Sequence, residues 1–453
     1  MAKNSTKDMT SGSPMKLILG FAIPLLMGML FQQVYSLMDT IIVGRFLGVS
    51  ALAAVGATGS INFLIIGFCL GVCNGFGLPI SQRFGAKDYD SLRKYVGNSA
   101  ILSVIIAAFM TALTVIFARD ILVLMKTPED IIDLSYAYIV VIFAGIPATI
   151  LYNILSSYLR ALGDSIAPLI FLVISACLNI GLDLLFIIVF HMGVFGAAFA
   201  TVLSQAVSGI LCLIYICSKV ELLHLHKDDW KLDKRYVSFL LMMGLPMGFQ
   251  YSITAIGSVI LQSAVNSLGS TAVASMTAAG KISIFMCCPF DALGSTMATY
   301  GGQNVGAGKL ERLGKGMWTA GLIGSIYSVI ILGVLNLFGH NLLLLFVDSS
   351  ETLVINQARH FLLVNAAFYI PLVYVNVVRF LIQGMGFSIC ALFAGVAEMI
   401  ARALVGIAFV PMFGFNAACF ASPLAWIFAD AFLIPAFYIT LNILKKRLGF
   451  TKK

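Results

Sequence analysis

The stretch SKVELLHLHKDDWKLDKRY, residues 218–236, is the longest polar interruption in a chain dominated by apolar runs. The 453 residues are 60% hydrophobic and 11% charged, whereas about 25% of the residues of a soluble globular protein are charged. Six apolar runs precede the stretch and six follow it, each about 20 residues long and so able to cross a bilayer as a helix. The sequence therefore predicts an all-α polytopic membrane protein with twelve transmembrane helices.

The two sets of six runs repeat one another. SQRFGAKDYDSLRKYVG at 81–97 resembles GQNVGAGKLERLGKGMW at 302–318, and Pro24 and Pro246 fall at matching points of the first and seventh runs. Because six is an even number of spans, both halves enter from the same side, the arrangement in which a substrate site lies between two repeats. A duplicated bundle without transport is the alternative. The expected parts are an N-terminal tail at 1–14, an N-lobe at 15–217, a connector at 218–236, a C-lobe at 237–444 and a basic tail at 445–453.

The basic residues predict the orientation. Most of the 28 Lys and Arg residues lie in the segments that share one side with the N-terminus, the connector and the C-terminus. Because basic residues mark cytoplasmic loops, we expect a multi-pass protein of the cell (inner) membrane with both termini in the cytoplasm. The first run is too long for the core of a signal peptide, so we expect it to be retained. The net charge of +8 expresses this bias and does not indicate a nucleic-acid partner.

Two acidic residues in the predicted spans lie at the same depth. A carboxylate at bilayer depth costs about 2.5–3.5 kcal/mol on insertion scales, which marks it as functional. At 1.5 Å per helical residue, Asp39 and Asp183 both lie about 10 Å below the outer surface. Thr201 falls at a similar level, Asn179 is one turn from Asp183, and Tyr35 is one turn below Asp39. The sequence therefore predicts a polar cluster within the N-lobe.

Three interpretations of this cluster stay open. Oxygen ligands suit a hard cation, so Na⁺ could bind at Asp39, Asn179, Asp183 and Thr201. One of two neighbouring buried carboxyl groups could instead carry a proton. The third interpretation is a structural hydrogen-bond cluster without an ion.

The remaining motifs give weaker indications. Glu398 precedes Arg402 by one helical turn, which predicts an ion pair, and no role follows for Asp291 or Asp430. Pro24 removes a backbone hydrogen bond from the first span, so we expect that helix to bend during function. GGQNVGAGKL lacks the first Gly and the Ser or Thr of a phosphate-binding loop, and no catalytic constellation is evident. The chain is therefore expected to be neither an enzyme nor dependent on a prosthetic cofactor, and to draw energy from an ion gradient.

Three segments resemble the multidrug and toxic compound extrusion (MATE) family: MDTIIVGRFLGVSALAAVG at 38–56, LNIGLDLLF at 178–186 and GQNVGAGK at 302–309. The resemblance implies two six-helix lobes that alternate between inward-facing and outward-facing states. It also implies export of small organic cations or amphipathic drugs in exchange for Na⁺ or H⁺. We expect the protein to work as a monomer in the lipid bilayer.

The resemblance also implies roles for individual residues. By position, the coupling-ion ligands correspond to Asp39, Asn179, Asp183, the backbone carbonyl of Ala197 and the hydroxyl of Thr201, with Tyr35 and Tyr138 as supporting hydrogen-bonding groups. The predicted seventh and tenth spans contain no Asp or Glu, unlike some members, so no equivalent site is expected in the C-lobe. The alternative function is a flippase for a lipid-linked saccharide precursor. Pyrophosphate recognition should need several basic groups, and only Lys281 and Arg402 lie well inside the spans.

Overall fold

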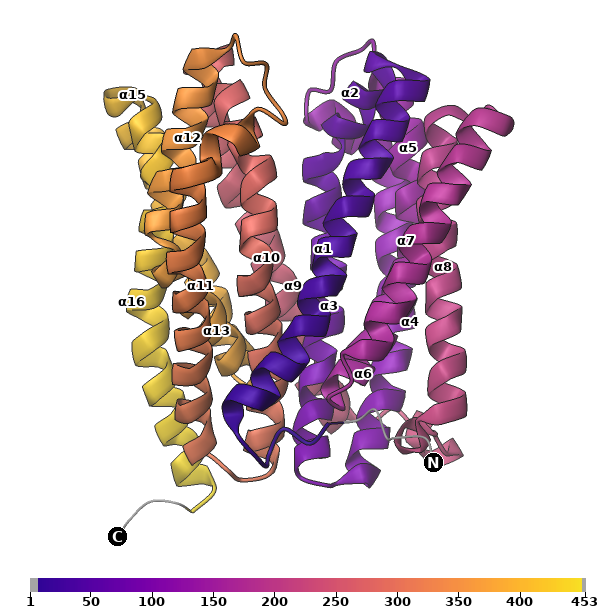
Figure 1. Ribbon diagram of the computed structural model, residues 1–453. Coiled ribbons are helices and arrows are strands. Elements are labelled where there is room, and N and C mark those ends of the chain that lie inside the picture. The colour runs from indigo at the N-terminus through magenta and orange to yellow at the C-terminus, as the bar shows by residue number, and fades with distance from the viewer. Residues whose placement is uncertain (1–6, 450–453) are drawn as a thin grey trace. The chain divides into compact units, whose positions relative to one another are not determined.

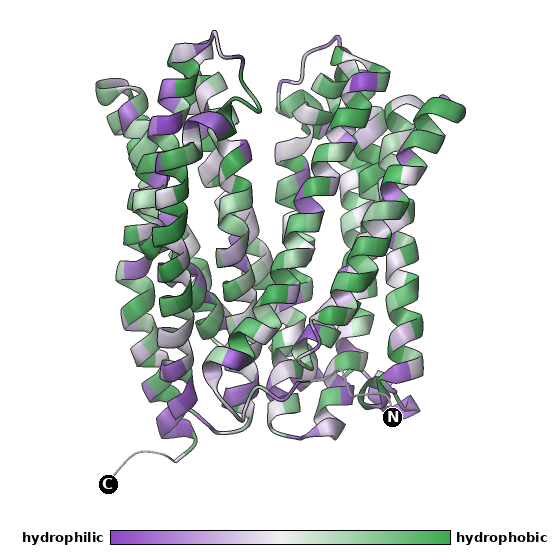
Figure 2. Ribbon diagram, viewed as in Figure 1, coloured by the Kyte–Doolittle hydropathy of each residue, from purple (hydrophilic) through white to green (hydrophobic). Residues whose placement is uncertain are grey.

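The computed structural model describes residues 7–449, whose helices are shown in Figure 1. Within this range there are ten helices long and apolar enough to cross a membrane, and two bent helix pairs that each supply one further span. Hydrophobic residues cover most of their length, and hydrophilic residues gather at ends such as the lower end of α16 (Figure 2). The predicted all-α membrane protein with twelve spans is confirmed. Residues 1–6 and 450–453 of the predicted tails lie outside the described residues.

The chain divides into two compact units, and two of the dividing points lie inside helices. The first unit contains Met27–Gly248 with Lys7 and Asp8, and the second contains Met9–Leu26 with residues 249–449. Helices α1 (Pro14–Leu47) and α9 (Lys234–Asn266) each run through a dividing point. Each of these two helices therefore packs its N-terminal part in one unit and its C-terminal part in the other. The domain limits predicted from the sequence stay predictions.

The remaining helices belong to one unit each. The first unit holds α2 (Val49–Ala57), α3 (Gly59–Gly85), α4 (Tyr89–Leu124), α5 (Ile132–Ala144), α6 (Ile146–Ala161), α7 (Ile166–Leu184) and α8 (Gly193–Lys219). The second unit holds α10 (Ser270–Gly306), α11 (Glu311–Leu343), α12 (Thr352–Ala367), α13 (Tyr369–Gly384), α14 (Ser388–Leu404), α15 (Val410–Phe413) and α16 (Phe415–Arg447).

The two halves break their helices at corresponding points, which supports the predicted internal repeat. The fourth span bends by 45° at Gly145, between α5 and α6, and the tenth bends by 53° at Phe368, between α12 and α13. Pro147 and Pro371 follow the two breaks and lack the N–H that would continue the preceding helix. The bends therefore arise from the same local chemistry in both halves.

The fifth and eleventh spans share a second irregularity. Each contains a five-residue π-helical segment: Leu185–Val189 ends the fifth span after α7, and Val405–Phe409 lies between α14 and α15 in the eleventh. Such segments are rare in proteins as a whole, but those that occur often lie at functional sites. The first lies directly after Asp183 and Leu184, so it adjoins the predicted ion site.

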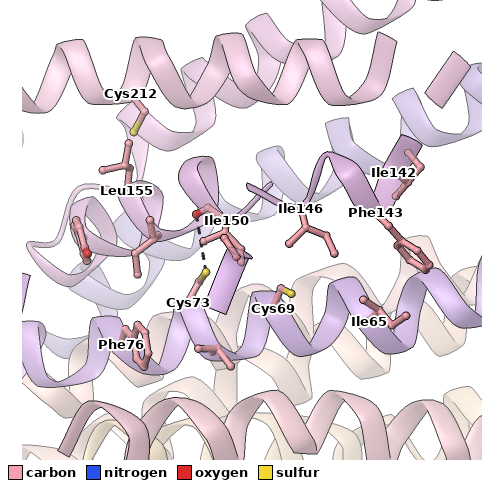
Figure 3. Close-up of a cluster of buried hydrophobic side chains, with 14 of the residues drawn as sticks. Ile65, Cys69, Cys73, Phe76, Ile142, Phe143, Ile146, Ile150, Leu155 and Cys212 are labelled. Atoms are coloured by element: carbon pink, nitrogen blue, oxygen red, sulfur yellow. Dashed lines mark hydrogen bonds between the residues drawn. The ribbon is translucent and has the colours of Figure 1, made fainter. Parts of the chain in front are cut away.

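Glycines let the N-terminal part of α9 pack closely on α3 in the first unit. A Cβ added at Gly71 would overlap the Met247 backbone, and one added at Gly75 would overlap Gly244. Gly71 and Gly75 are four residues apart, as are Gly244 and Gly248, the spacing that brings membrane helices into backbone contact. Figure 3 shows the other face of α3, where Cys69 and Cys73 pack against Ile150 and its neighbours on α6.

The N-terminal part of α1 is anchored in the second unit by the residues that precede it. The Met9 backbone N–H donates to Gln303 Oε1 at 2.8 Å, and Asn304 Nδ2 donates to the Met9 carbonyl at 3.2 Å. Lys309 Nζ donates to the Thr10 carbonyl at 2.8 Å. Pro24 therefore lies in a helical segment fixed to one unit, just before the point at which α1 enters the other.

The connector at 218–236 is ordered and packs on α4 in the first unit. Asn98 Nδ2 donates to the Lys231 carbonyl at 3.2 Å, and Asn98 Oδ1 accepts from the Asp233 N–H at 3.1 Å. The buried Asp229 lies 3.7 Å from Arg93 Nε. These contacts fix the polypeptide that leads into α9.

Candidate functional site

The predicted ion ligands lie on three helices of the first unit. Asp39 is on α1, Asn179 and Asp183 are one turn apart on α7, and Ala197 and Thr201 are one turn apart on α8. The short turn at residues 190–192 reverses the chain between α7 and α8, so that these two faces meet. All five residues belong to one compact unit. The depth count from the sequence predicted this for Asp39, Asn179, Asp183 and Thr201, whereas Ala197 was implied only by the family resemblance.

Hydrogen bonds join the α7 and α8 members of the cluster. Asn179 Nδ2 donates to Thr201 Oγ1 at 3.4 Å, and Thr201 Oγ1 donates to the Ala197 carbonyl at 3.1 Å. Asn179, Asp183 and Ala197 are buried, with at most 1% of each residue exposed. The Thr201 hydroxyl therefore lies between the Asn179 amide and the Ala197 carbonyl and hydrogen-bonds to both.

The Asp39 and Asp183 side chains lie within hydrogen-bonding reach of each other. Asp183 is fully buried, whereas Asp39 is half-buried. Two ionised carboxylates offer only acceptors, and like charges about 4 Å apart repel by about 4 kcal/mol at an effective dielectric constant of 20. A proton or a cation between the two groups would remove that repulsion.

The cluster has more buried oxygen atoms than hydrogen-bond donors. Asp39 Oδ1, Asn179 Oδ1 and both carboxylate oxygens of Asp183 are buried without a hydrogen-bond partner. Leaving such an acceptor unsatisfied costs about 1–3 kcal/mol, and more when it is charged. Four unpartnered oxygens beside the Thr201 hydroxyl and the Ala197 carbonyl fit a hard cation that takes several oxygen ligands. Over residues 7–449 no group of three or more His, Cys, Asp or Glu side chains is placed to hold a metal ion.

Tyr35 and Tyr138 border the cluster. Both phenols lie within electrostatic range of both carboxylates. Tyr138 is buried on α5, and Tyr35 lies one turn before Asp39 on α1. Their hydroxyl groups are therefore placed beside the two acids, and their role as supporting hydrogen-bonding groups stays a prediction.

The second unit contains a different charged cluster, which the sequence indicated only in part. Arg402 Nη2 donates to Glu398 Oε2 at 3.3 Å, in agreement with the predicted ion pair. Arg379 also donates to Glu398, from α13. This partner was missed because it lies 19 residues before Glu398 and on another helix, so no spacing along a single helix indicates it.

Two carboxylates within one bundle that leave buried oxygens for a cation, repeated six-span halves and broken helices define a secondary transporter. The MatE family profile matches residues 24–185 and again residues 246–412, one match in each half of the chain. The chain belongs to the MATE family, whose members are transporters and not enzymes.

Known proteins agree with this assignment. The chain is 31% identical to the "Probable multidrug resistance protein YoeA" of Bacillus subtilis over 346 residues, and this match covers 74% of each chain. It is 30% identical over 373 residues to the "Probable multidrug resistance protein YpnP" of the same organism, covering 82% of each. A crystal structure of a MATE protein in complex with MaL6 superposes with a TM-score of 0.91 at 24% identity, covering 98% of this chain and all of that one. This last similarity supports the fold.

Proposed function

We propose that this transporter is a cation-coupled antiporter that exports small organic cations or amphipathic drugs from the cytoplasm by alternating access. It works as a monomer in the cell membrane, with both termini in the cytoplasm and Na⁺ or H⁺ as the coupling ion. The names of the two Bacillus subtilis relatives support multidrug export. The observation that carries the ion coupling is the set of four buried, unpartnered oxygens on Asp39, Asn179 and Asp183.

In this proposal Asp39 and Asp183 hold the ion between them. Asn179, Thr201 and the Ala197 carbonyl supply the remaining oxygens for Na⁺, whereas a proton needs only the two carboxyl groups. An empty site leaves two buried charges that repel, so occupancy stabilises whichever arrangement of α1 brings Asp39 to Asp183. Because a ligand shifts a conformational equilibrium only through its different affinity for the two states, the ion selects that arrangement.

The half-buried position of Asp39 supports ion exchange. Asp183 cannot meet solvent directly, since it is fully buried, but Asp39 is partly accessible on α1. Movement of α1 would open the site without disturbing the α7–α8 contact between Asn179 and Thr201. The bending of α1 that we predict at Pro24 would supply this movement.

Proteoliposomes test the proposal. Efflux of a fluorescent organic cation is measured with Na⁺ and pH gradients imposed separately. We expect one of the two gradients to drive efflux by the wild type, and Asp39→Asn and Asp183→Asn each to abolish gradient-driven efflux. Asp133→Asn, which removes an exposed carboxylate from the same unit, is the matched control and should transport normally. Normal gradient-driven efflux by a folded Asp39→Asn variant would contradict the proposal.

The flippase alternative has weaker support in the second unit. Arg379 and Arg402 both donate to Glu398 and are buried, so each guanidinium group already has a carboxylate partner. Substitution of Glu398 or recruitment of further basic groups would be needed for that function. Transport of a lipid-linked pyrophosphate by the wild type in the same proteoliposomes would favour it.

A further inference from the structure

The second unit contains three buried charged side chains that form one ion-paired triad. Arg379 on α13 and Arg402 on α14 donate to different oxygens of Glu398, also on α14. The exposed fractions are 6% for Arg379, 4% for Glu398 and 8% for Arg402. Because two cations share one carboxylate, this triad has a formal charge of +1. Arg379 Nε and Arg402 Nη1 are also buried without a hydrogen-bond acceptor.

A fourth group lies beside the triad on α16. The Asp430 carboxyl group is within electrostatic range of Arg379, yet residues 7–449 contain no ion pair that involves it. Asp430 Oδ1 is buried and has no hydrogen-bond partner. An ionised Asp430 would balance the charge of the triad and would attract Arg379. The structure instead pairs Arg379 with Glu398, the arrangement expected when Asp430 is neutral.

We propose that Asp430 is a second coupling site, which binds a proton, and that Arg379 is its positioning residue. With Asp430 protonated, Arg379 pairs with Glu398. When Asp430 gives its proton to water, Arg379 turns to the new carboxylate and Glu398 keeps Arg402 as its partner. The proposal rests on the antiport function proposed above and adds a proton site in the unit that lacks a counterpart of Asp39 and Asp183.

A proton needs only one carboxyl group, which Asp430 supplies, whereas Na⁺ would need several oxygen ligands. The groups near Asp430 and Arg379 come from each packed helix: Tyr251 of α9, Asp291 of α10, Tyr374 of α13, and Glu398 and Arg402 of α14. Arg359 of α12 is instead bonded to the Asn336 carbonyl.

Arg379 can leave Glu398 because Glu398 has a second partner, Arg402. If Arg379 left, Glu398 would retain the ion pair with Arg402, so the buried carboxylate would stay compensated. Removing the last partner of a buried charge is strongly destabilising, and Arg402 prevents that for Glu398. The pairing of Arg402 and Glu398 on one helix face, one turn apart, keeps this second partner in place in both states.

Proton release on substrate binding tests the proposal. Purified protein in weakly buffered detergent solution is titrated with a fluorescent organic cation, and a pH indicator counts the protons released. We expect Asp430→Asn to release one proton fewer per protein than the wild type. Asp348→Asn is the control, because Asp348 is an exposed acid of the same unit, and this variant should release as many protons as the wild type. Unchanged proton release by Asp430→Asn would overturn the proposal.

Two further variants keep the result decisive. Asp39→Asn should retain the proton release that belongs to Asp430, so failure of the N-terminal site and failure of this site give different results. If Asp430→Asn does not fold, Asp430→Glu keeps a carboxyl group and extends it by one methylene towards or away from Arg379. That variant should release its proton with a midpoint shifted along the pH axis, and a midpoint identical to that of the wild type would overturn the proposal.

Discussion

At the scale of single residues, Asp88 shows how one carboxylate begins a helix. It is the N-cap of α4, where Oδ1 accepts from the Ser91 N–H at 3.1 Å and Oδ2 accepts from Arg83 Nη1 at 3.2 Å. Partial burial on its own raises the pKa of Asp88. The hydrogen bonds from Ser91 and the Arg83 guanidinium outweigh that effect and hold the pKa below its usual range. Ionised Asp88 therefore stabilises the folded state.

We predict that Asp88→Ala lowers the stability of the protein at neutral pH by about 0.5–2 kcal/mol, the usual cost of losing an N-cap. The folded-state pKa lies below the unfolded value, so this stabilisation is complete above the usual pKa of about 3.9 and disappears as the pH falls through the lowered value. Thermal melts in detergent from pH 7 downward should therefore show the two proteins converging in acid. Asp120→Ala, an exposed acid on the same helix, should change little, and a gap that widens in acid would contradict the assignment.

Gly97 on α4 has no side chain, and this leaves room for the connector to pack against the helix. A Cβ at Gly97 would overlap the Asp229 carbonyl in the connector. We predict that Gly97→Ala displaces the connector and makes 218–236 more sensitive to proteases in membrane preparations. Gly280→Ala makes the same helix-favouring change with no atom within 4 Å, so it should leave the digestion pattern unchanged. Equal sensitivity of both variants would show that the connector does not depend on this contact.

At the scale of elements, the apolar runs predicted the spans well because each run must match the thickness of the bilayer. Equal depth also predicted that Asp39 and Asp183 share a site, since depth follows from the rise per residue. The pairing of Arg379 with Glu398 could not be predicted in this way, because it depends on how α13 packs beside α14. The same holds for α1 and α9, whose division between the two units follows from packing and leaves no periodic signal in the sequence.

Pro24 and Pro246 lie at equivalent places in these two divided helices. Each precedes its dividing point by two residues, since the units part after Leu26 and after Gly248. A proline inside a helix removes one backbone hydrogen bond, which lowers the cost of bending there. We predict that Pro24→Ala and Pro246→Ala each slow transport in proteoliposomes several-fold while folded yield stays close to that of the wild type.

Pro289 supplies the control for this prediction. It also lies inside a long helix, α10, but that helix belongs wholly to the second unit. Pro289→Ala should therefore slow transport less than the other two variants. Equal slowing by all three would mean that helix flexibility in general, and not bending at the dividing points, limits the rate.

At the scale of the whole molecule, the distribution of basic residues predicts which ends face the cytoplasm. The last turn of α16 carries Lys445, Lys446 and Arg447, and the connector also contains several basic residues. We predict that epitope tags at residue 3, within 218–236 and at residue 453 are all reached only from the cytoplasmic side. A tag beside Glu129, between α4 and α5, should be reached from outside, and an external connector would reverse the proposed direction of transport.

Antiport also predicts how the coupling ion and the exported compound affect each other's binding affinity. If the coupling ion and the exported compound favour different states, each must weaken the binding of the other by the same factor, because linkage between two binding sites is reciprocal. Such couplings are typically about 5–150-fold. We predict a reduction of this order in the affinity for a fluorescent organic cation when the N-terminal ion site is saturated. The ion affinity should fall by the same factor when the organic cation is saturating.

The variants identify where this coupling resides. Asp39→Asn and Asp183→Asn remove one of the two charges that hold the ion, so titrations of these variants should show substrate binding that no longer depends on the ion at that site. Asp133→Asn should retain the full wild-type factor, because its exposed carboxylate takes no part in the cluster. Unequal factors in the two directions for the wild type would show that ion and substrate are not linked at equilibrium. Full ion dependence in folded Asp39→Asn protein would instead place the coupling ion elsewhere in the molecule.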